Sequence, residues 1–196
     1  MRALVLPMET LMRQIAVYVM AVLGTALSAS AQDHRELGAH VHGAGTLKIA
    51  IEGNKVSMDL SAPADDILGF EHQPSTPEQS KILDDAKAAL AQPLKVFTLP
   101  DAAGCKVASA NVVFNAAEPA PAGAAAANKA DDAEHQHADF DVDYELTCTA
   151  PGKIATLAFP YFQLFTRAQK LTVTVVSAKG QSESDVTRAS PELAIK

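Results

Sequence analysis

The histidines are the residues of this 196-residue chain whose type and spacing indicate chemistry. They fall in three places, and two of these places are His-x-His pairs. All six are candidate metal ligands, and they are His34, His40, His42, His72, His135 and His137. Neutral imidazole is the commonest protein ligand for zinc and copper, and thiolates are its main competitor. The pattern therefore predicts a metal site.

The alternative is that the histidines are ordinary surface residues. A His-x-His pair is common by chance, and a surface histidine is usually only solvated. Three histidine positions in one small, acidic, exported chain bring ligation level with this reading.

A tetrahedral zinc site takes four ligands from histidine, cysteine and carboxylate. We expect His40 and His42 to provide two ligands, and His72 or Glu71 a third. The candidates for the fourth position are His135, His137, Asp139, Asp141 and water. A histidine site without thiolates also suits copper(II) and nickel(II), so zinc, copper and nickel all stay open on the residues alone.

The first thirty-one residues have the pattern of a signal peptide. Arg13 is the positive flank, residues 15–27 are the apolar centre and Ala29-Ser30-Ala31 is a small-residue cleavage motif. Met12 directly precedes Arg13, so translation starts at either Met1 or Met12. The apolar run is shorter than the roughly 20 residues that span a bilayer. We expect an exported protein without a membrane anchor, in which residues 32–196 form a single metal-binding domain.

The net charge of the whole chain is −7 at neutral pH. This charge argues against nucleic acid and anionic membrane surfaces as partners, and it suits a protein that attracts cations. Cys105 and Cys148 are an even number of cysteines in an exported chain, which favours one disulfide. A Cys/His metal site is the less favoured alternative, because neither cysteine lies beside a histidine or in a Cys-x-x-Cys pair.

Alternating polar and apolar residues at 46–51 and 55–60, with Glu52-Gly53-Asn54 between them, predict a β-hairpin. This hairpin places His40 and His42 just before its first strand. Residues two apart on an extended segment point the same way, so both imidazoles would face one ion.

One helix is predicted clearly. Thr76 is its expected N-cap, Pro77 its first residue and Pro93 its stop. Residues 64–72 are expected to form a loop or a short helical turn, and residues 93–99 a short strand or bend.

The remaining pattern is mostly β. Strands are predicted at 105–114 and 138–148 as antiparallel neighbours with the two cysteines at their far ends, at 154–159, and in a last hairpin of 171–176 and 181–187. An aromatic helical turn is expected at 160–165. The Ala/Pro/Gly-rich stretch at about 116–137 is expected to be a flexible insertion. The fold class is therefore a β-rich α+β domain, with an antiparallel, sandwich-like sheet, one main helix packed on it and a flexible loop rich in alanine that carries histidine.

Several motifs in the mature chain resemble the ZrgA-like family, a zinc-regulated family of exported, periplasmic bacterial proteins first described as a domain of unknown function. These motifs are the run from Gly38 to Gly43, the run from Gly69 to Pro74, Leu99-Pro100 leading to Gly104-Cys105, the acidic strand that ends at Cys148, and Gly180-Gln181. The resemblance covers essentially the whole mature chain.

The resemblance implies periplasmic zinc binding in support of zinc acquisition, without catalysis. It also implies that a zinc uptake transporter is a candidate partner. It places ligands in the His-x-His segment and in a histidine-rich loop between the cysteines, a loop that here is mostly alanine. Two other functions stay open: a β-rich structural or interaction module with incidental histidines, and a zinc hydrolase, which the absence of a His-Glu-x-x-His motif disfavours.

Overall fold

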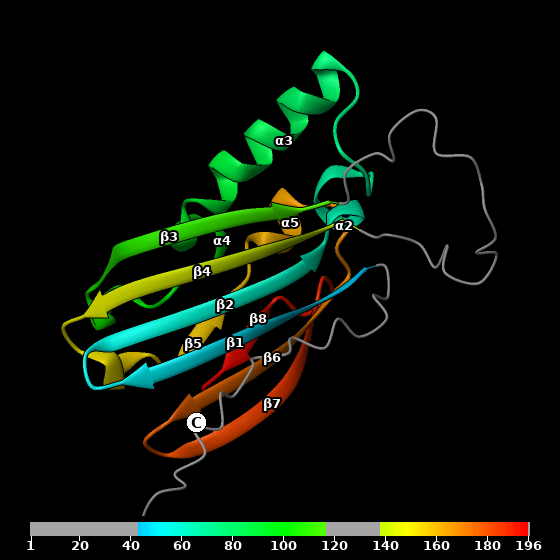
Figure 1. Cartoon of the computed structure of the whole chain (residues 1–196). Coiled ribbons are helices and arrows are strands. Elements are labelled where there is room, and N and C mark those ends of the chain that lie inside the picture. The colour runs from blue at the N-terminus through cyan, green and yellow to red at the C-terminus, as the bar shows by residue number, and fades with distance from the viewer. Residues whose placement is uncertain (1–42, 117–137, 196) are drawn as a thin grey trace, which may run out of the picture. The chain divides into compact units, whose positions relative to one another are not determined.

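The computed structural model describes residues 43–116 and 138–195, all within one structural unit that spans residues 38–196. Their main feature is a six-stranded sheet in the order β3-β4-β2-β1-β6-β7 (Figure 1). The strands of this sheet are β1 (Ala44–Glu52), β2 (Lys55–Pro63), β3 (Cys105–Asn115), β4 (Asp139–Cys148), β6 (Lys170–Ser177) and β7 (Gly180–Thr187). The expected β-rich α+β class is confirmed.

The sheet is mixed, whereas the sequence analysis expected an antiparallel one. β1 and β2 form the predicted hairpin, with Thr46 opposite Ser61 and Glu52 opposite Lys55. On its other edge, however, β1 pairs with β6 in parallel. The reason is the long connection between β4 and β6, which returns the chain to the end of the sheet where β1 begins. β6 therefore runs in the same direction as β1, and β7 pairs with it antiparallel.

A small second sheet contains β5 (Thr156–Ala158) and β8 (Glu192–Ala194). The strand expected at 154–159 therefore exists but lies outside the main sheet. The strand β8 was not predicted, because three residues carry too little periodicity to be recognised. Leu157 of β5 is buried in the common core.

The described part of the chain has four α-helices, so the expectation of one main helix is not confirmed. They are α2 (Ala64–Leu68), α3 (Pro77–Leu90), α4 (Pro93–Val96) and α5 (Tyr161–Leu164), and single 3-10 turns cover Asp101–Ala103 and Pro151–Lys153. The longest, α3, begins as predicted: the Thr76 hydroxyl accepts the Gln79 N–H at 3.2 Å. Residues 93–96 form a helix instead of the expected strand or bend, because Pro93 begins a new helical turn at its first position.

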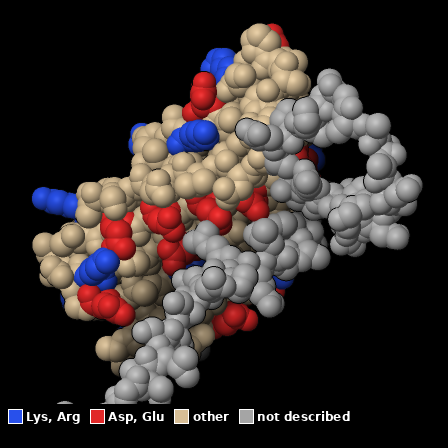
Figure 2. Space-filling view, in the orientation of Figure 1, with Lys and Arg blue, Asp and Glu red and all other residues tan. Residues whose placement is uncertain are grey.

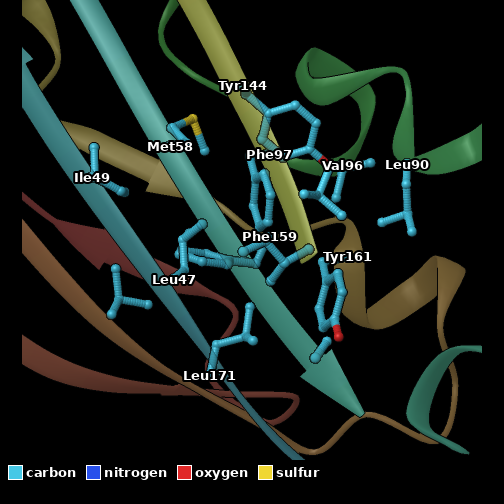
Figure 3. Packing of buried hydrophobic residues seen from close by; sticks show 14 of the residues in the cluster. Leu47, Ile49, Met58, Leu90, Val96, Phe97, Tyr144, Phe159, Tyr161 and Leu171 are labelled. Atoms are coloured by element: carbon cyan, nitrogen blue, oxygen red, sulfur yellow. The ribbon is translucent and has the colours of Figure 1, made fainter. Parts of the chain in front are cut away.

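The core lies between one face of the main sheet and the helices and small strands that cover it. Aromatic rings dominate the centre (Figure 3). The ring of Phe97 has its centroid 6.2 Å from that of Tyr144, 5.6 Å from that of Phe159 and 6.1 Å from that of Tyr161. Phe97 follows α4, Tyr144 lies in β4 of the main sheet, Phe159 lies between β5 and α5, and Tyr161 begins α5. These rings therefore join the main sheet to the segments that cover it.

Two expectations lie outside the described residues. These are the signal peptide at 1–31 and nearly all of the insertion at about 116–137. Within 43–116 and 138–195, none of the helices has the length and apolar character needed to cross a membrane.

Candidate metal centre

The described residues that border the histidine segments lie together at one end of the main sheet. At this end β1 begins after Gly43, β2 ends at Pro63, β3 ends at Asn115 and β4 begins after Ala138. The strand register proves the proximity, because Asp139 lies opposite both Pro63 and Asn115. We name this the Gly43 end of the sheet (Figure 1).

Gly43, the residue that follows His42, is held from both sides. Its N–H donates to Oδ1 of Asp66 at 2.7 Å. Its carbonyl accepts the N–H groups of Gln169 at 3.0 Å and Lys170 at 2.8 Å. Its φ is +81°, and a Cβ here would lie 3.2 Å from Cγ of Gln169. Glycine therefore suits this position both conformationally and sterically.

The short helix α2 connects several parts of the Gly43 end. The N–H of Ala64 donates to the carbonyl of Ala138 at 2.9 Å. Arg167 forms a bidentate ion pair with Asp65, at 2.8 Å to Oδ1 and 2.6 Å to Oδ2. This pairing raises the pKa of the Arg167 guanidinium. α2 is thus bonded both to the chain entering β4 and to the chain entering β6.

His72 lies on the turn that follows α2, and its imidazole contacts a backbone carbonyl. Nδ1 lies 2.8 Å from the carbonyl oxygen of Gln73. A carbonyl can only accept, so Nδ1 is the donor of this contact, and in the neutral ring Nε2 is then the nitrogen with the lone pair. The ring stacks on Phe70 with centroids 5.1 Å apart, and the residue is exposed. A backbone carbonyl that fixes the tautomer is the usual support of a metal-binding histidine.

The turn that carries His72 contacts the end of β3. Nε2 of Gln73 donates to the carbonyl of Ala116 at 3.3 Å, next to the border of residues 117–137. Glu71, the alternative third ligand, is half-buried on the same turn. This contact places the predicted Glu71 and His72 at the Gly43 end.

The two predicted carboxylate ligands of β4 share one donor. Nδ2 of Asn115 donates to Asp139 and to Asp141, each at 3.0 Å. Asp139 is only 5% exposed, whereas Asp141 is half-buried. Asp141 is therefore the more accessible of the two for a metal ion.

The sheet face opposite the core carries a row of acidic side chains. Alternate residues of β4 point away from the core and are all acidic up to Glu145; they are Asp139, Asp141, Asp143 and Glu145. Asp59 of β2 lies directly opposite Asp143. Figure 2 shows acidic side chains gathered on this side of the molecule. Their charge raises the local concentration of cations.

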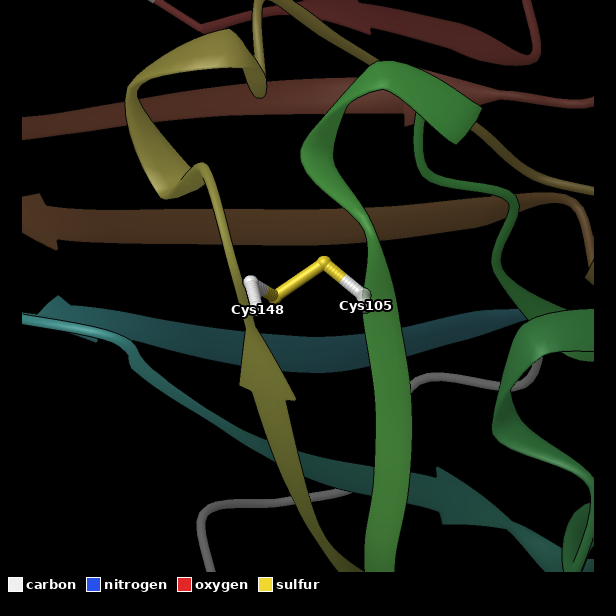
Figure 4. Close-up of a disulfide and its surroundings, with 2 residues drawn as sticks. All are labelled: Cys105 and Cys148. Carbon is white, nitrogen blue, oxygen red and sulfur yellow. A yellow bond between two sulfur atoms is a disulfide. The ribbon is translucent and has the colours of Figure 1, made fainter.

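Cys105 and Cys148 form a disulfide at the other end of β3 and β4 (Figure 4). They lie opposite each other in the strand register, as the sequence predicted. We name this the cysteine end of the sheet. The alternative of a Cys/His metal site is therefore wrong, because neither sulfur is available as a thiolate.

Five of the predicted ligands lie outside the described residues: His34, His40, His42, His135 and His137. Among residues 43–116 and 138–195, no three side chains of His, Cys, Asp or Glu are grouped closely enough to hold a metal ion. Of the predicted ligands, the structure thus describes His72, Glu71, Asp139 and Asp141. It also describes Gly43 and Ala138, the residues that directly follow His42 and His137.

Sequence reasoning missed Asp66 and Arg167, which order the Gly43 end. The only local signal was the Asp65-Asp66 pair after Pro63, which is typical of a helix N-terminus. Their partners lie 23 and 102 residues away, so no local pattern could identify them.

Comparison with known proteins identifies a family for the chain as a whole. A family model described as ZrgA family zinc uptake protein matches residues 39–195. No curated protein matches the chain.

Proposed function

Because the chain belongs to the ZrgA family of zinc uptake proteins, we propose that it captures or buffers zinc in the periplasm in support of zinc acquisition. The ion is its cargo, and the protein acts by binding, without catalysis. Delivery to a zinc uptake transporter is the partner interaction that fits this role. The disulfide supports export, since such bonds persist in oxidising compartments.

The observation that carries the proposal is the arrangement of the Gly43 end. Gly43 and Ala138 directly follow the two His-x-His segments. Each of them forms a hydrogen bond with α2. The turn after α2 carries the exposed His72, whose Nδ1 is bonded to a carbonyl. The donors present are imidazole and carboxylate, which fit zinc.

In this proposal His40 and His42 bind the ion together with His72. The fourth position is taken by Glu71, His135, His137, Asp141 or water. His34 lies six residues before His40 and is proposed as an additional, weaker ligand. The acidic face contributes long-range attraction rather than ligands.

The proposal is tested by titrating the metal-free mature protein with zinc, copper(II), nickel(II) and magnesium while its thermal unfolding is followed. Zinc at 100 times its dissociation constant should stabilise the fold by about 2.7 kcal/mol. Magnesium prefers oxygen ligands and serves as the matched control, because carboxylates alone would respond to it.

Stabilisation by zinc but not by magnesium would support an imidazole site. A response to copper or nickel alone would identify a different cargo. The absence of any response would favour a structural module with incidental histidines. Hydrolysis of ester, phosphate or lactam substrates by the zinc-loaded protein would contradict the non-catalytic role.

A further inference from the structure

Asp66 is an unusual residue for the interior of this protein. The residue is only 1% exposed, although most of the buried side chains of this protein are apolar or aromatic. Burial raises the pKa of the neighbouring Tyr161, and the negative charge of Asp66 raises it further. A buried carboxylate costs stability relative to an apolar side chain of similar size, so its presence is better explained by what it orders than by the stability it adds.

What Asp66 orders is the entry of the chain into β1. Its Oδ1 accepts the N–H of Gly43 at 2.7 Å, which is a short, charge-assisted hydrogen bond. The carbonyl of the same glycine is held by β6, through the N–H groups of Gln169 and Lys170. Gly43 is thus fixed on one side by α2 and on the other by the sheet.

The same helix determines where the His72 turn begins. α2 ends at Leu68 and is capped by Gly69, which has a φ of +83° and whose N–H donates to the carbonyl of Asp65. Three residues later the chain reaches His72. α2 is itself fixed by the ion pair of Asp65 with Arg167. The separation between Gly43 and the His72 turn is therefore set through α2.

We infer that Asp66 is a positioning residue for metal binding, which holds the entry into β1 at a fixed distance from the His72 turn. This inference rests on the proposed zinc-binding function. Asp66 acts through Gly43 and needs no contact with the ion. A site whose ligands come from separate segments binds tightly only when those segments are already in place.

The experiment compares Asp66→Ala with Asp66→Asn in the mature, disulfide-bonded protein. Asparagine retains an Oδ1 that can accept the Gly43 N–H, whereas alanine does not. Leu90→Ala, on α3, is the control for a general loss of stability, because Leu90 is fully buried but makes no hydrogen bond to this end. Zinc dissociation constants come from competition with a chromophoric chelator, and hydrogen exchange of the Gly43 amide reports the bond itself.

We expect Asp66→Ala to weaken zinc binding about tenfold or more, in the range found when residues that support metal ligands are replaced. Asp66→Asn and Leu90→Ala should stay within about threefold of the wild type. Exchange of the Gly43 amide should accelerate in Asp66→Ala alone. This accelerated exchange is independent of any metal.

Two results would overturn the inference while leaving zinc binding itself intact. One is an Asp66→Ala protein that binds zinc as tightly as the wild type. The other is an equal loss in Asp66→Ala and Leu90→Ala, which would show a general effect of stability. A wild-type protein that binds no zinc would overturn both this inference and the proposed function.

If Asp66→Ala does not fold, Gly43→Ala tests the same contact from its other side. Alanine at a φ of +81° and close to Gln169 would displace the backbone while leaving Asp66 in place. Its zinc binding should weaken by the same factor, and unchanged binding would overturn the inference.

Discussion

The two ends of the β3–β4 pair are held by different kinds of bond. At the cysteine end, one covalent bond joins Cys105 to Cys148, which lie opposite each other in the register. At the Gly43 end, about 30 Å away along the strands, the links are hydrogen bonds and ion pairs from α2, Asn115 and the chain before β6.

This difference separates stability from binding. The disulfide closes a loop with a sequence separation of 43 and limits the unfolded chain, so it stabilises the fold from the end of β4 opposite Asp139. The polar links at the Gly43 end add less stability each, but they determine where the borders of the histidine segments lie. We expect changes at the two ends to affect different measurements.

The largest effect on stability should come from replacing both cysteines by alanine. For this loop the chain-entropy model gives a loss of about 4 kcal/mol in the free energy of unfolding. Denaturant unfolding measures the loss, and zinc titration of the folded variant should give a dissociation constant within about threefold of the wild type. A large fall in zinc affinity in the folded variant would show that the two ends are not independent.

At the Gly43 end, Arg188→Ala should cause the next largest loss in the free energy of unfolding. The Arg188 guanidinium donates to the carbonyl groups of Phe162, Phe165 and Ala168, just before the residues that bind Gly43. Loss of these charged donors should cost about 3 kcal/mol. Arg167→Ala is the matched control: it removes the same charge from the same region but breaks an exposed pair worth at most about 1 kcal/mol. Denaturant unfolding measures both variants. Equal losses of stability would show that the hydrogen bonds of Arg188 do not stabilise the Gly43 end more than the Asp65–Arg167 ion pair does.

Tyr161 provides a test at alkaline pH. It is fully buried, and within the described part of the chain its hydroxyl has no hydrogen-bond partner. Burial, and then the charge of Asp66, raise its pKa far above the ordinary value. The folded state therefore favours the neutral phenol, so this contribution to stability is complete below about pH 10 and is lost as the pH rises further.

Tyr161→Phe should keep the neutral-pH stability within about 1 kcal/mol and should lose less stability above about pH 10 than the wild type. Unfolding curves from pH 7 to pH 11 test both statements. Burial also raises the pKa of Tyr144, and Tyr144→Phe is the matched variant on the side of β4 nearer the cysteine end. An unchanged alkaline profile in both variants would show that the buried phenols do not govern alkaline unfolding.

The smallest effect on stability should come from the titration of Asp185, which lies on the exposed face of β7. The Thr172 hydroxyl at 2.8 Å and the Lys170 ammonium at 3.1 Å lower the pKa of its carboxyl. Its contribution to stability is therefore present above the pKa of the unfolded chain and is lost as the pH falls through the lower, folded value. Thr172→Val removes the first donor and should move the pKa of Asp185 upward, measured by NMR titration. No movement would show that the hydroxyl is not the main cause.

The sequence predicted the parts of the fold that depend on neighbouring residues. The β1–β2 hairpin around Gly53, the N-terminus of α3 at Thr76 and the pairing of the cysteine-bearing strands are all confirmed. Each depends on a turn, a cap or an alternation that lies within a short stretch of chain or between consecutive strands.

Contacts between distant segments could not be predicted. The parallel pairing of β1 with β6 depends on the path of the chain through β5 and α5, and no periodicity in either strand indicates it. The residue types predicted the disulfide between the two cysteines, which is confirmed, and they predicted His72 as a ligand, which stays a prediction. The role of Asp66 depends on a partner 23 residues away, which is visible only in the folded protein.

We propose that zinc binds through histidines at the Gly43 end. Zinc titration of the mature protein and of the His40→Ala/His42→Ala variant tests this most directly. The wild type should bind zinc, and its affinity should fall as the pH decreases through about 6.5, where imidazole becomes protonated. The double variant should bind about 100-fold more weakly or worse, because two of four ligands are lost. An unchanged dissociation constant in the double variant would contradict the claim.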